Sequence, residues 1–166
     1  MTTEQQDLAK ELNALADSAG DAEELMSIIV GRLQERLAYF NWVGFYMLEK
    51  SSEGGDPVLV LGPYVGAITP HTRIPLNQGI CGAAASSGRT VIVDDVNSDP
   101  RYLACSLETK SEIVVPITVK GEVVGELDID SHTPAAFQDD DRQLVEHCAR
   151  LVGHYLEKAA YGQARP

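Results

Sequence analysis

The chain has 166 residues, of which 44% are hydrophobic and 23% are charged, a composition that fits one globular domain with one core. Acidic residues outnumber basic ones by 25 to 13, and the net charge of -12 opposes binding to a phosphate backbone, so we expect no nucleic-acid partner. No apolar run approaches the ~20 residues that span a bilayer, and the N-terminus lacks the basic and apolar segments of a secretory signal. We therefore expect a cytoplasmic protein with no membrane partner.

Leucines at helical spacing predict two amphipathic helices at the start of the chain. Leu8, Leu12 and Leu15 place the first at about residues 4–18. Asp21 and Glu24 resemble a capping box that opens the second helix. Its buried stripe is expected to contain Leu25, Ile28, Ile29, Leu33 and Leu37.

Short runs typical of β-strands follow the helices. Residues 42–48 and 58–64 predict a hairpin with a loose loop. Residues 73–75 are expected to be extended, because the residue before a proline is pushed toward β geometry. The small residues of 80–87 indicate a short, tightly packed helix that ends at Gly88.

The second half of the chain contains the strongest strand signals. Residues 90–93 predict a strand, and 94–110 predict a long irregular segment with one helical turn. Residues 112–119 and 122–130 predict a strand pair, and a helix from about 138 to 158 closes the chain. This order indicates an α+β domain, in which a central antiparallel sheet has the terminal helices on one face and loops on the other.

Acidic residues interrupt the two strongest strands. Side chains alternate along a strand, so Asp128 and Asp130 share one face while the apolar residues beside them face the helices. Glu112 reaches the same face only if the loop between the strands holds an odd number of residues. A two-residue turn at Lys120-Gly121 would place it on the wrong face, and we expect the odd loop.

Three carboxylates on one face repel one another, and a bound cation, protonation or water relieves the repulsion. A ligand ammonium group would satisfy two of them, while a third with a raised pKa could donate a proton. The alternative is a solvated polar face on an edge hairpin. A thiol at Cys105, upstream of these acids, suggests a redox or nucleophilic site for a small cationic or zwitterionic ligand.

The three cysteines predict no disulfide framework, and they lack the paired spacing of a zinc site, so we expect no metal. Cys148 lies on the apolar stripe of the last helix and is expected in the core. Cys81 falls in the first turn of a short helix, where the helix dipole would lower a thiol pKa. Cys105 lies in the irregular segment beside Arg101, and spacing alone does not rank it against Cys81.

Two aromatic residues share a face of the first strand. Trp42 and Tyr46 are four residues apart, and they form either part of the core or the wall of a pocket for an apolar or methylthio-like group. His71 falls in a loop, and His132 follows the acidic strand closely.

Seven short motifs together carry a family likeness: Asn41-Trp42-Val43-Gly44-Phe45-Tyr46, Leu61-Gly62-Pro63-Tyr64, Arg73-Ile74-Pro75, Gly79-Ile80-Cys81-Gly82, Ala104-Cys105, Ser111-Glu112-Ile113-Val114-Val115-Pro116 and Leu127-Asp128-Ile129-Asp130-Ser131. From about residue 25 to 158, the chain resembles the free methionine-(R)-sulfoxide reductases, which are stand-alone GAF domains. The resemblance implies a single GAF domain over 1–166, with an N-terminal helix in 1–20 and a core in 21–160.

The resemblance also implies an activity and assigns roles to residues. Cys105 matches the nucleophilic cysteine that attacks the sulfoxide of free L-methionine-(R)-S-oxide and becomes a sulfenic acid. Catalytic and substrate-binding roles fall to Glu112, Asp128 and Asp130, and binding roles to Cys81, Trp42 and Tyr46. No cofactor is implied beyond an external thiol reductant of the thioredoxin type, and a homodimer is expected.

One stretch departs from the family pattern. Members commonly carry a resolving cysteine in the segment that corresponds to 65–72, which contains no thiol here. Cys81 could resolve Cys105, an external reductant could attack the sulfenic acid directly, or the pocket could serve as a sensor. The alternative function is therefore a non-catalytic GAF module that binds a small molecule.

Overall fold

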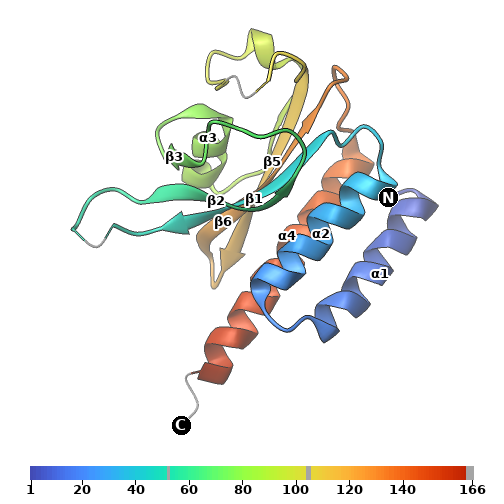
Figure 1. Ribbon diagram of the computed structural model, residues 1–166, viewed down its shortest axis with the longest axis vertical. Coiled ribbons are helices and arrows are strands. Elements are labelled where there is room, and N and C mark those ends of the chain that lie inside the picture. Colours follow the sequence, from blue (N-terminus) through green and yellow to red (C-terminus); the bar gives the residue numbers. More distant parts are fainter. Residues whose placement is uncertain (52, 104–105, 164–166) are drawn as a thin grey trace.

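The computed structural model describes residues 1–51, 53–103 and 106–163, which form a sheet with helices on both faces (Figure 1). Helices α1, α2 and α4 cover one face of the sheet, and α3 lies on the other with β3 beside it. The elements, in chain order, are α1 (Thr3–Ser18), α2 (Ala22–Arg36), β1 (Trp42–Glu49), β2 (Val58–Val65), β3 (Arg73–Pro75), α3 (Gly79–Ser87), β4 (Val91–Val93), the 3-10 turn η1 (Val96–Ser98), β5 (Ser111–Val119), β6 (Glu122–Ser131) and α4 (Asp139–Gln163).

The sheet has six antiparallel strands in the order β3-β2-β1-β6-β5-β4. This arrangement confirms the expected α+β class with terminal helices on one face. The acidic strands β5 and β6 lie near the centre of the sheet, next to β1 with its aromatic pair. The predicted solvated edge hairpin is therefore excluded, because both faces of these strands are covered.

The helical face is held by an apolar core and by side-chain caps at the helix starts. Thr2 and Gln5 form a complete capping box at α1. Asp21 caps α2 by accepting a hydrogen bond from the Glu24 backbone N–H at 2.8 Å. The Glu24 carboxylate accepts from the Gly20 N–H instead of the Asp21 N–H, so only half of the predicted box forms.

The β5–β6 connection is a two-residue turn, so the expected odd loop is wrong. Lys120 and Gly121 both have positive φ, at 52° and 79°, as the tight hairpin turns require. Glu112 nevertheless lies on the same face as Asp128 and Asp130, because β6 contains a bulge. Ile117 pairs with Gly125 and Thr118 with Val123, which leaves one extra residue on β6. The bulge restores the parity that the short turn would have reversed.

Helix α3 and its neighbours form a second, smaller core on the other face. The helix ends as predicted at Gly88, which adopts the left-handed conformation with φ 67°. Gly82 must be glycine for close packing, since a Cβ there would meet the Leu76 carbonyl oxygen at 2.7 Å. Among the described residues, no helix has the length and apolar character needed to cross a membrane.

Candidate active site

The α3 side of the central strands carries four buried carboxylates. Glu112 on β5 pairs directly with Asp130 on β6, as the parity argument anticipated. Asp128 and Glu126 follow on the same face of β6, and the four residues are between 0% and 6% exposed. Leu127, between them, lies in the helical core, so the sheet separates the acids from the apolar layer.

Burial dominates the electrostatics of this face. Desolvation raises the pKa of Asp128 to about 6, although hydrogen bonds from Glu112 and Cys81 oppose the shift. Desolvation, with the charge of Asp128 added, raises the pKa of Asp130 well above its ordinary value. The pKa of Glu126 is raised for the same two reasons. The face can therefore hold protons near neutral pH and surrender them to a bound cation.

Glu126 is a site residue that the sequence analysis missed. Within the described part of the chain, neither of its carboxylate oxygens has a hydrogen-bond partner. The signal was present, since Glu126, Asp128 and Asp130 follow the two-residue period of a strand. The parity of Glu126 does not depend on the bulge, because the extra residue Val124 precedes Glu126, Asp128 and Asp130 alike.

Cys81 belongs to the acidic cluster. Its thiol donates to Asp128 Oδ2 at 3.4 Å from the first turn of α3. The prediction that the helix dipole lowers its pKa is wrong, because burial raises the pKa of this thiol and the charges of Asp128, Glu126 and Glu112 raise it further. Desolvation and three carboxylates outweigh one helix terminus.

The other two cysteines differ in what the structure describes. Cys105 lies outside the described residues, so the structure does not test its predicted pairing with Cys81. Its neighbour Leu103 lines a small cavity together with Cys81, Glu112 and Asp128. Cys148 is buried in the helical core as predicted, and burial raises its pKa to about 12.

Trp42 and Tyr46 lie directly beside the acids. Across the β1–β6 pair, Trp42 is opposite Asp130 and Tyr46 is opposite Glu126. The two rings are stacked with centroids 6.2 Å apart. Both are buried core residues, and each lines a small cavity beside the acids.

The same aromatic pair holds the loop between β2 and β3. Trp42 Nε1 donates to the Ala67 carbonyl at 3.1 Å, and the Tyr46 hydroxyl donates to the His71 carbonyl at 2.7 Å. This loop is the segment in which the family pattern predicted a thiol. The loop is fixed over the acidic face at two points.

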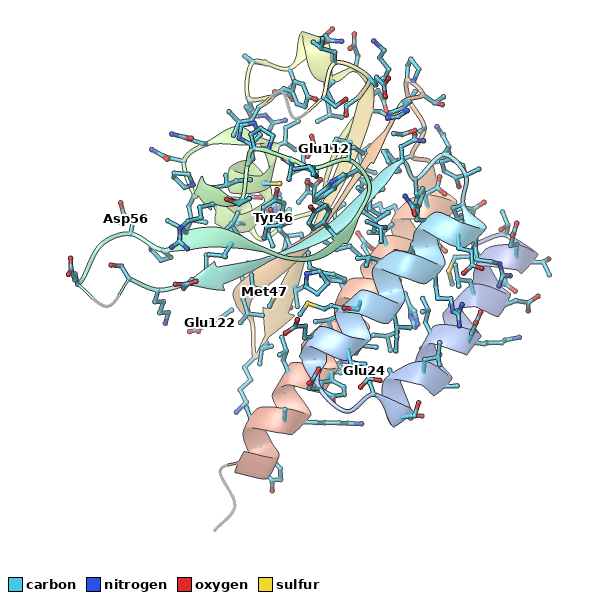
Figure 2. All side chains as sticks on the ribbon, viewed as in Figure 1. Glu24, Tyr46, Met47, Asp56, Glu112 and Glu122 are labelled. Carbon is cyan, nitrogen blue, oxygen red and sulfur yellow. The ribbon has the colours of Figure 1, made fainter. Side chains whose placement is uncertain are left out.

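Two small cavities remain under this loop. One, of about 20 Å³, is lined by residues that include Tyr46, His71 and Cys81. The other, of about 90 Å³, is lined by Trp42, Asp130 and His132 among others. Figure 2 shows Glu112 and Tyr46 on the α3 side of the sheet, while Met47 points toward α2. Both histidines noted in the sequence thus border the site.

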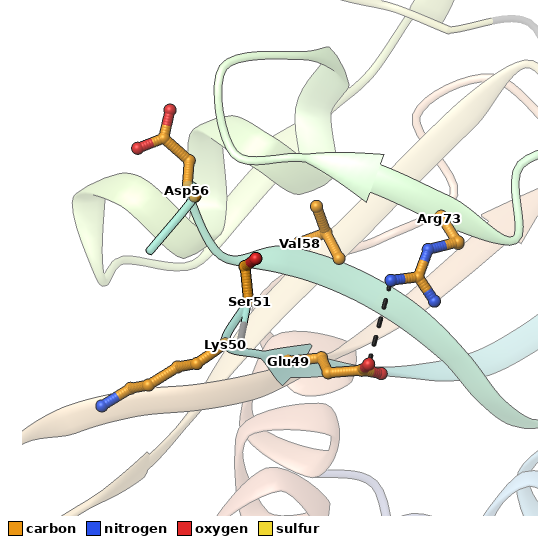
Figure 3. Close-up of a pocket in the computed structure, with 7 residues that line it drawn as sticks. Glu49, Lys50, Ser51, Asp56, Val58 and Arg73 are labelled. Carbon is orange, nitrogen blue, oxygen red and sulfur yellow. Dashed lines mark ion pairs between the residues drawn. The ribbon is translucent and has the colours of Figure 1, made fainter. Parts of the chain in front are cut away.

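A larger hollow lies elsewhere, beside the loop that connects β1 to β2 (Figure 3). Its lining includes Glu49 and Arg73, whose charged groups approach to 3.9 Å with both side chains 59% exposed. A solvent-screened pair of this kind contributes little energy. The acidic face, with its buried thiol and carboxylates, is the chemically distinctive site.

A GAF domain model matches residues 21–156. The free methionine-R-sulfoxide reductase of Escherichia coli is 40% identical over 152 residues, which cover 88% of this chain and 87% of that protein. The chain belongs to the free methionine-R-sulfoxide reductase family. It is thus an oxidoreductase with a GAF fold.

Solved structures of free methionine-R-sulfoxide reductases agree with the present fold. The enzyme from Neisseria meningitidis, in complex with its substrate, has a TM-score of 0.87 and 32% identity, covering 95% of this chain and 91% of that one. The fRMsr of Staphylococcus aureus, also in complex with substrate, has a TM-score of 0.81 and 34% identity, covering 92% and 95%.

Proposed function

We propose that the chain reduces free L-methionine-(R)-S-oxide to methionine. The observation that carries the proposal is the buried acidic face beside Trp42 and Tyr46, in a chain that matches family members along nearly its whole length. Free methionine sulfoxide brings an ammonium group for the carboxylates and a methyl sulfoxide end for the aromatic wall.

The chemistry is a two-electron transfer of oxygen to sulfur. The Cys105 thiolate attacks the sulfoxide sulfur and forms a sulfur–sulfur bond, while a carboxylic acid protonates the oxygen. The oxygen then passes to the Cys105 sulfur as the sulfur–oxygen bond of the substrate and the sulfur–sulfur bond break, and methionine leaves. Cys105 ends as a sulfenic acid, oxidised by the two electrons that the sulfoxide gained. A second thiol then forms a disulfide with Cys105 and releases water, and a further thiol restores the Cys105 thiol.

The carboxylates divide two tasks between them. Ionised groups hold the substrate ammonium, and a group that keeps its proton near neutral pH supplies the proton for the oxygen. Asp128, with a pKa of about 6, and Asp130, whose pKa is also raised by burial, suit these roles because the ammonium charge can ionise one without ionising the other. Glu112 lies opposite Asp130 on the neighbouring strand and adds a further carboxylate to this face.

The surroundings of Cys81 support regeneration by an external thiol. A resolving cysteine must ionise, and burial among carboxylates raises the pKa of Cys81. We therefore place direct attack by a thioredoxin-type reductant ahead of a Cys81 disulfide. No bound cofactor enters this cycle.

Purified protein with dithiothreitol tests the proposal. We expect it to consume L-methionine-(R)-S-oxide and to leave the S epimer, with turnover abolished in Cys105→Ser. Cys148→Ser is the matched control, because its thiol lies on the opposite side of the sheet. Full turnover in Cys105→Ser would refute the mechanism, and binding without turnover under any thiol would support a non-catalytic module.

Two further expectations are carried over from the sequence. We propose that the protein is cytoplasmic and that it forms a homodimer. Sedimentation equilibrium at several concentrations measures the oligomeric state. A monomer with full turnover would show that the assembly is not required for activity.

A further inference from the structure

One thiol and two carboxylates converge on one point of the acidic face. The Cys81 sulfur, a Glu112 oxygen and an Asp128 oxygen all lie within 4.8 Å of one another, and all three residues are buried. They come from α3, β5 and β6, so no sequence spacing could have revealed the group. Thiolate and carboxylate together form a donor set that suits a transition metal.

The sulfur–oxygen distance between Cys81 and Asp128 matches the edge of a tetrahedron. A tetrahedral zinc ion with bonds of about 2.3 Å to sulfur and about 2.0 Å to oxygen places those two ligands about 3.5 Å apart. Cys81 Sγ and Asp128 Oδ2 are 3.4 Å apart. The cavity at this point is about 20 Å³. That volume holds one water-sized particle, so it admits a single ion.

Unpartnered oxygens beside the group point to a cation. Within the described residues, Asp128 Oδ1 and both oxygens of Glu126 are buried without a hydrogen-bond partner. Glu126 lies close enough to Cys81 for its charge to act on the thiol. Buried carboxylate oxygens without partners are costly, and a divalent ion would compensate them.

We propose that Cys81, Glu112 and Asp128 form a site for one divalent transition-metal ion, of which Zn²⁺ is the best fit. Water fills the fourth position, and the ion displaces the thiol proton. Mg²⁺ does not bind, because it requires octahedral oxygen ligands and rejects sulfur.

The metal and the substrate ammonium compete for Glu112 and Asp128. This consequence rests on the proposed function, whereas metal binding does not. Zn²⁺ is therefore an inhibitor that raises the apparent KM for methionine sulfoxide and leaves kcat unchanged, since saturating substrate displaces the ion.

Cobalt spectroscopy tests the binding without any activity measurement. Chelator-treated protein, kept reduced with a phosphine, is titrated with Co²⁺. We expect one ion per chain, a thiolate-to-cobalt charge-transfer band and the visible bands of tetrahedral cobalt, all removed by Zn²⁺ and unaffected by Mg²⁺. Cys81→Ser should lose the charge-transfer band, while Cys105→Ser and Cys148→Ser should keep it.

Carboxylate variants and the unaltered protein complete the test. Glu112→Gln and Asp128→Asn should each weaken Co²⁺ binding by at least about tenfold, since even outer-shell losses reach that size. X-ray absorption of the zinc-loaded native chain should show one sulfur ligand, a readout that needs no folded variant. A band that persists in Cys81→Ser, a band that vanishes in Cys105→Ser, or zinc without sulfur would overturn the site.

Steady-state kinetics with Zn²⁺ form a separate arm. A rise in apparent KM supports competition, and a fall in kcat at constant KM overturns it. If the chain shows no turnover, the proposed function fails while the cobalt result stands on its own.

Discussion

Asp128 is held in the middle of the sheet at a position where its charged form is disfavoured. Burial raises its pKa to about 6 from an ordinary value of 3.8. Between those pH values the folded chain binds more protons than the unfolded chain, so the free energy of unfolding falls as the pH rises through this window. Across this window, the titration of Asp128 lowers the free energy of unfolding by about 3 kcal/mol.

An Asp128→Asn substitution removes that titration. We expect the variant to be more stable than the native chain by roughly 3 kcal/mol above pH 6, with the difference closing near pH 4, where Asp128 is protonated in both states. Urea denaturation at a series of pH values measures the effect. Glu122→Gln, on an exposed position of the same strand, is the control and should change little. Equal stability of Asp128→Asn and the native chain at pH 8 would contradict the assigned burial.

Trp42 is packed so closely that the residue at position 44 must lack a side chain. A Cβ on Gly44 would lie 2.3 Å from Trp42 Cη2 and 2.9 Å from Tyr64 Cβ. The indole cannot swing aside freely, because its Nε1 is bonded to the Ala67 carbonyl. Glycine at 44 is therefore part of the construction of the aromatic wall.

A Gly44→Ala substitution should destabilise the chain by about 1–3 kcal/mol, as overpacking does, and should raise the KM for methionine sulfoxide. Trp42 is the one tryptophan of the chain, so its fluorescence reports the displacement directly. Gly31→Ala is a control of opposite sign: it lies within α2, and among the described residues no atom beyond its chain neighbours and the backbone of its own helix lies within 4 Å of the added Cβ. It should stabilise the helix by roughly 0.5–1 kcal/mol. Unchanged fluorescence in Gly44→Ala would show that the wall tolerates the methyl group.

Local sequence predicted which residues gather at the candidate site better than it predicted their protonation. The aromatic pair and the acids of β6 followed from a two-residue period that neighbouring residues define. The direction in which the pKa of Cys81 shifts did not, because it depends on burial and on the nearby charges of Asp128 and Glu112, which arise only in the folded chain. Glu126 was missed although it shares the two-residue period of Asp128 and Asp130.

At the level of elements, the predicted helices and strands lie within a few residues of the observed ones, apart from the longer end of α4. Periodicity and turn residues act over short distances, so sequence suffices for them. Strand pairing is different. The two-residue turn and the bulge of β6 compensate each other across the hairpin, and only their sum fixes the face that Glu112 occupies.

Removal of Val124, the extra residue of the bulge, should therefore invert the rest of β6. Glu126, Asp128 and Asp130 would face the helical core, and Leu127 would face the cavity. We expect loss of cooperative unfolding or of soluble protein, followed by near-ultraviolet circular dichroism and denaturant titration. Val124→Ala keeps the bulge and should cost no more than about 1 kcal/mol at this half-buried position. A deletion variant with native stability would show that pairing can slip without cost.

In the whole molecule, the sheet separates two hydrophobic cores, one on each of its faces. The helical core contains most of the buried apolar residues, and the α3 side contains the site. Helix α1 belongs to the helical core although it precedes the matched GAF region of 21–156. Its Leu8 and Leu12 are fully buried, and Gln5 donates to Asp141 on α4 at 2.9 Å.

Damage to the α1 layer should consequently lower stability while sparing the chemistry. Leu12→Ala is expected to reduce the free energy of unfolding by about 2–5 kcal/mol through a cavity between α1 and its neighbours. Lys10→Ala, exposed on the same helix, should stay within about 0.5 kcal/mol of the native chain. Denaturant titration measures both, and kcat/KM is compared at a temperature where Leu12→Ala remains folded. Because the sheet lies between Leu12 and the carboxylates, kcat/KM should match the native value there. A proportional fall would mean that the helical layer sets the geometry of the acidic face through β6, the strand whose two faces belong to the two cores.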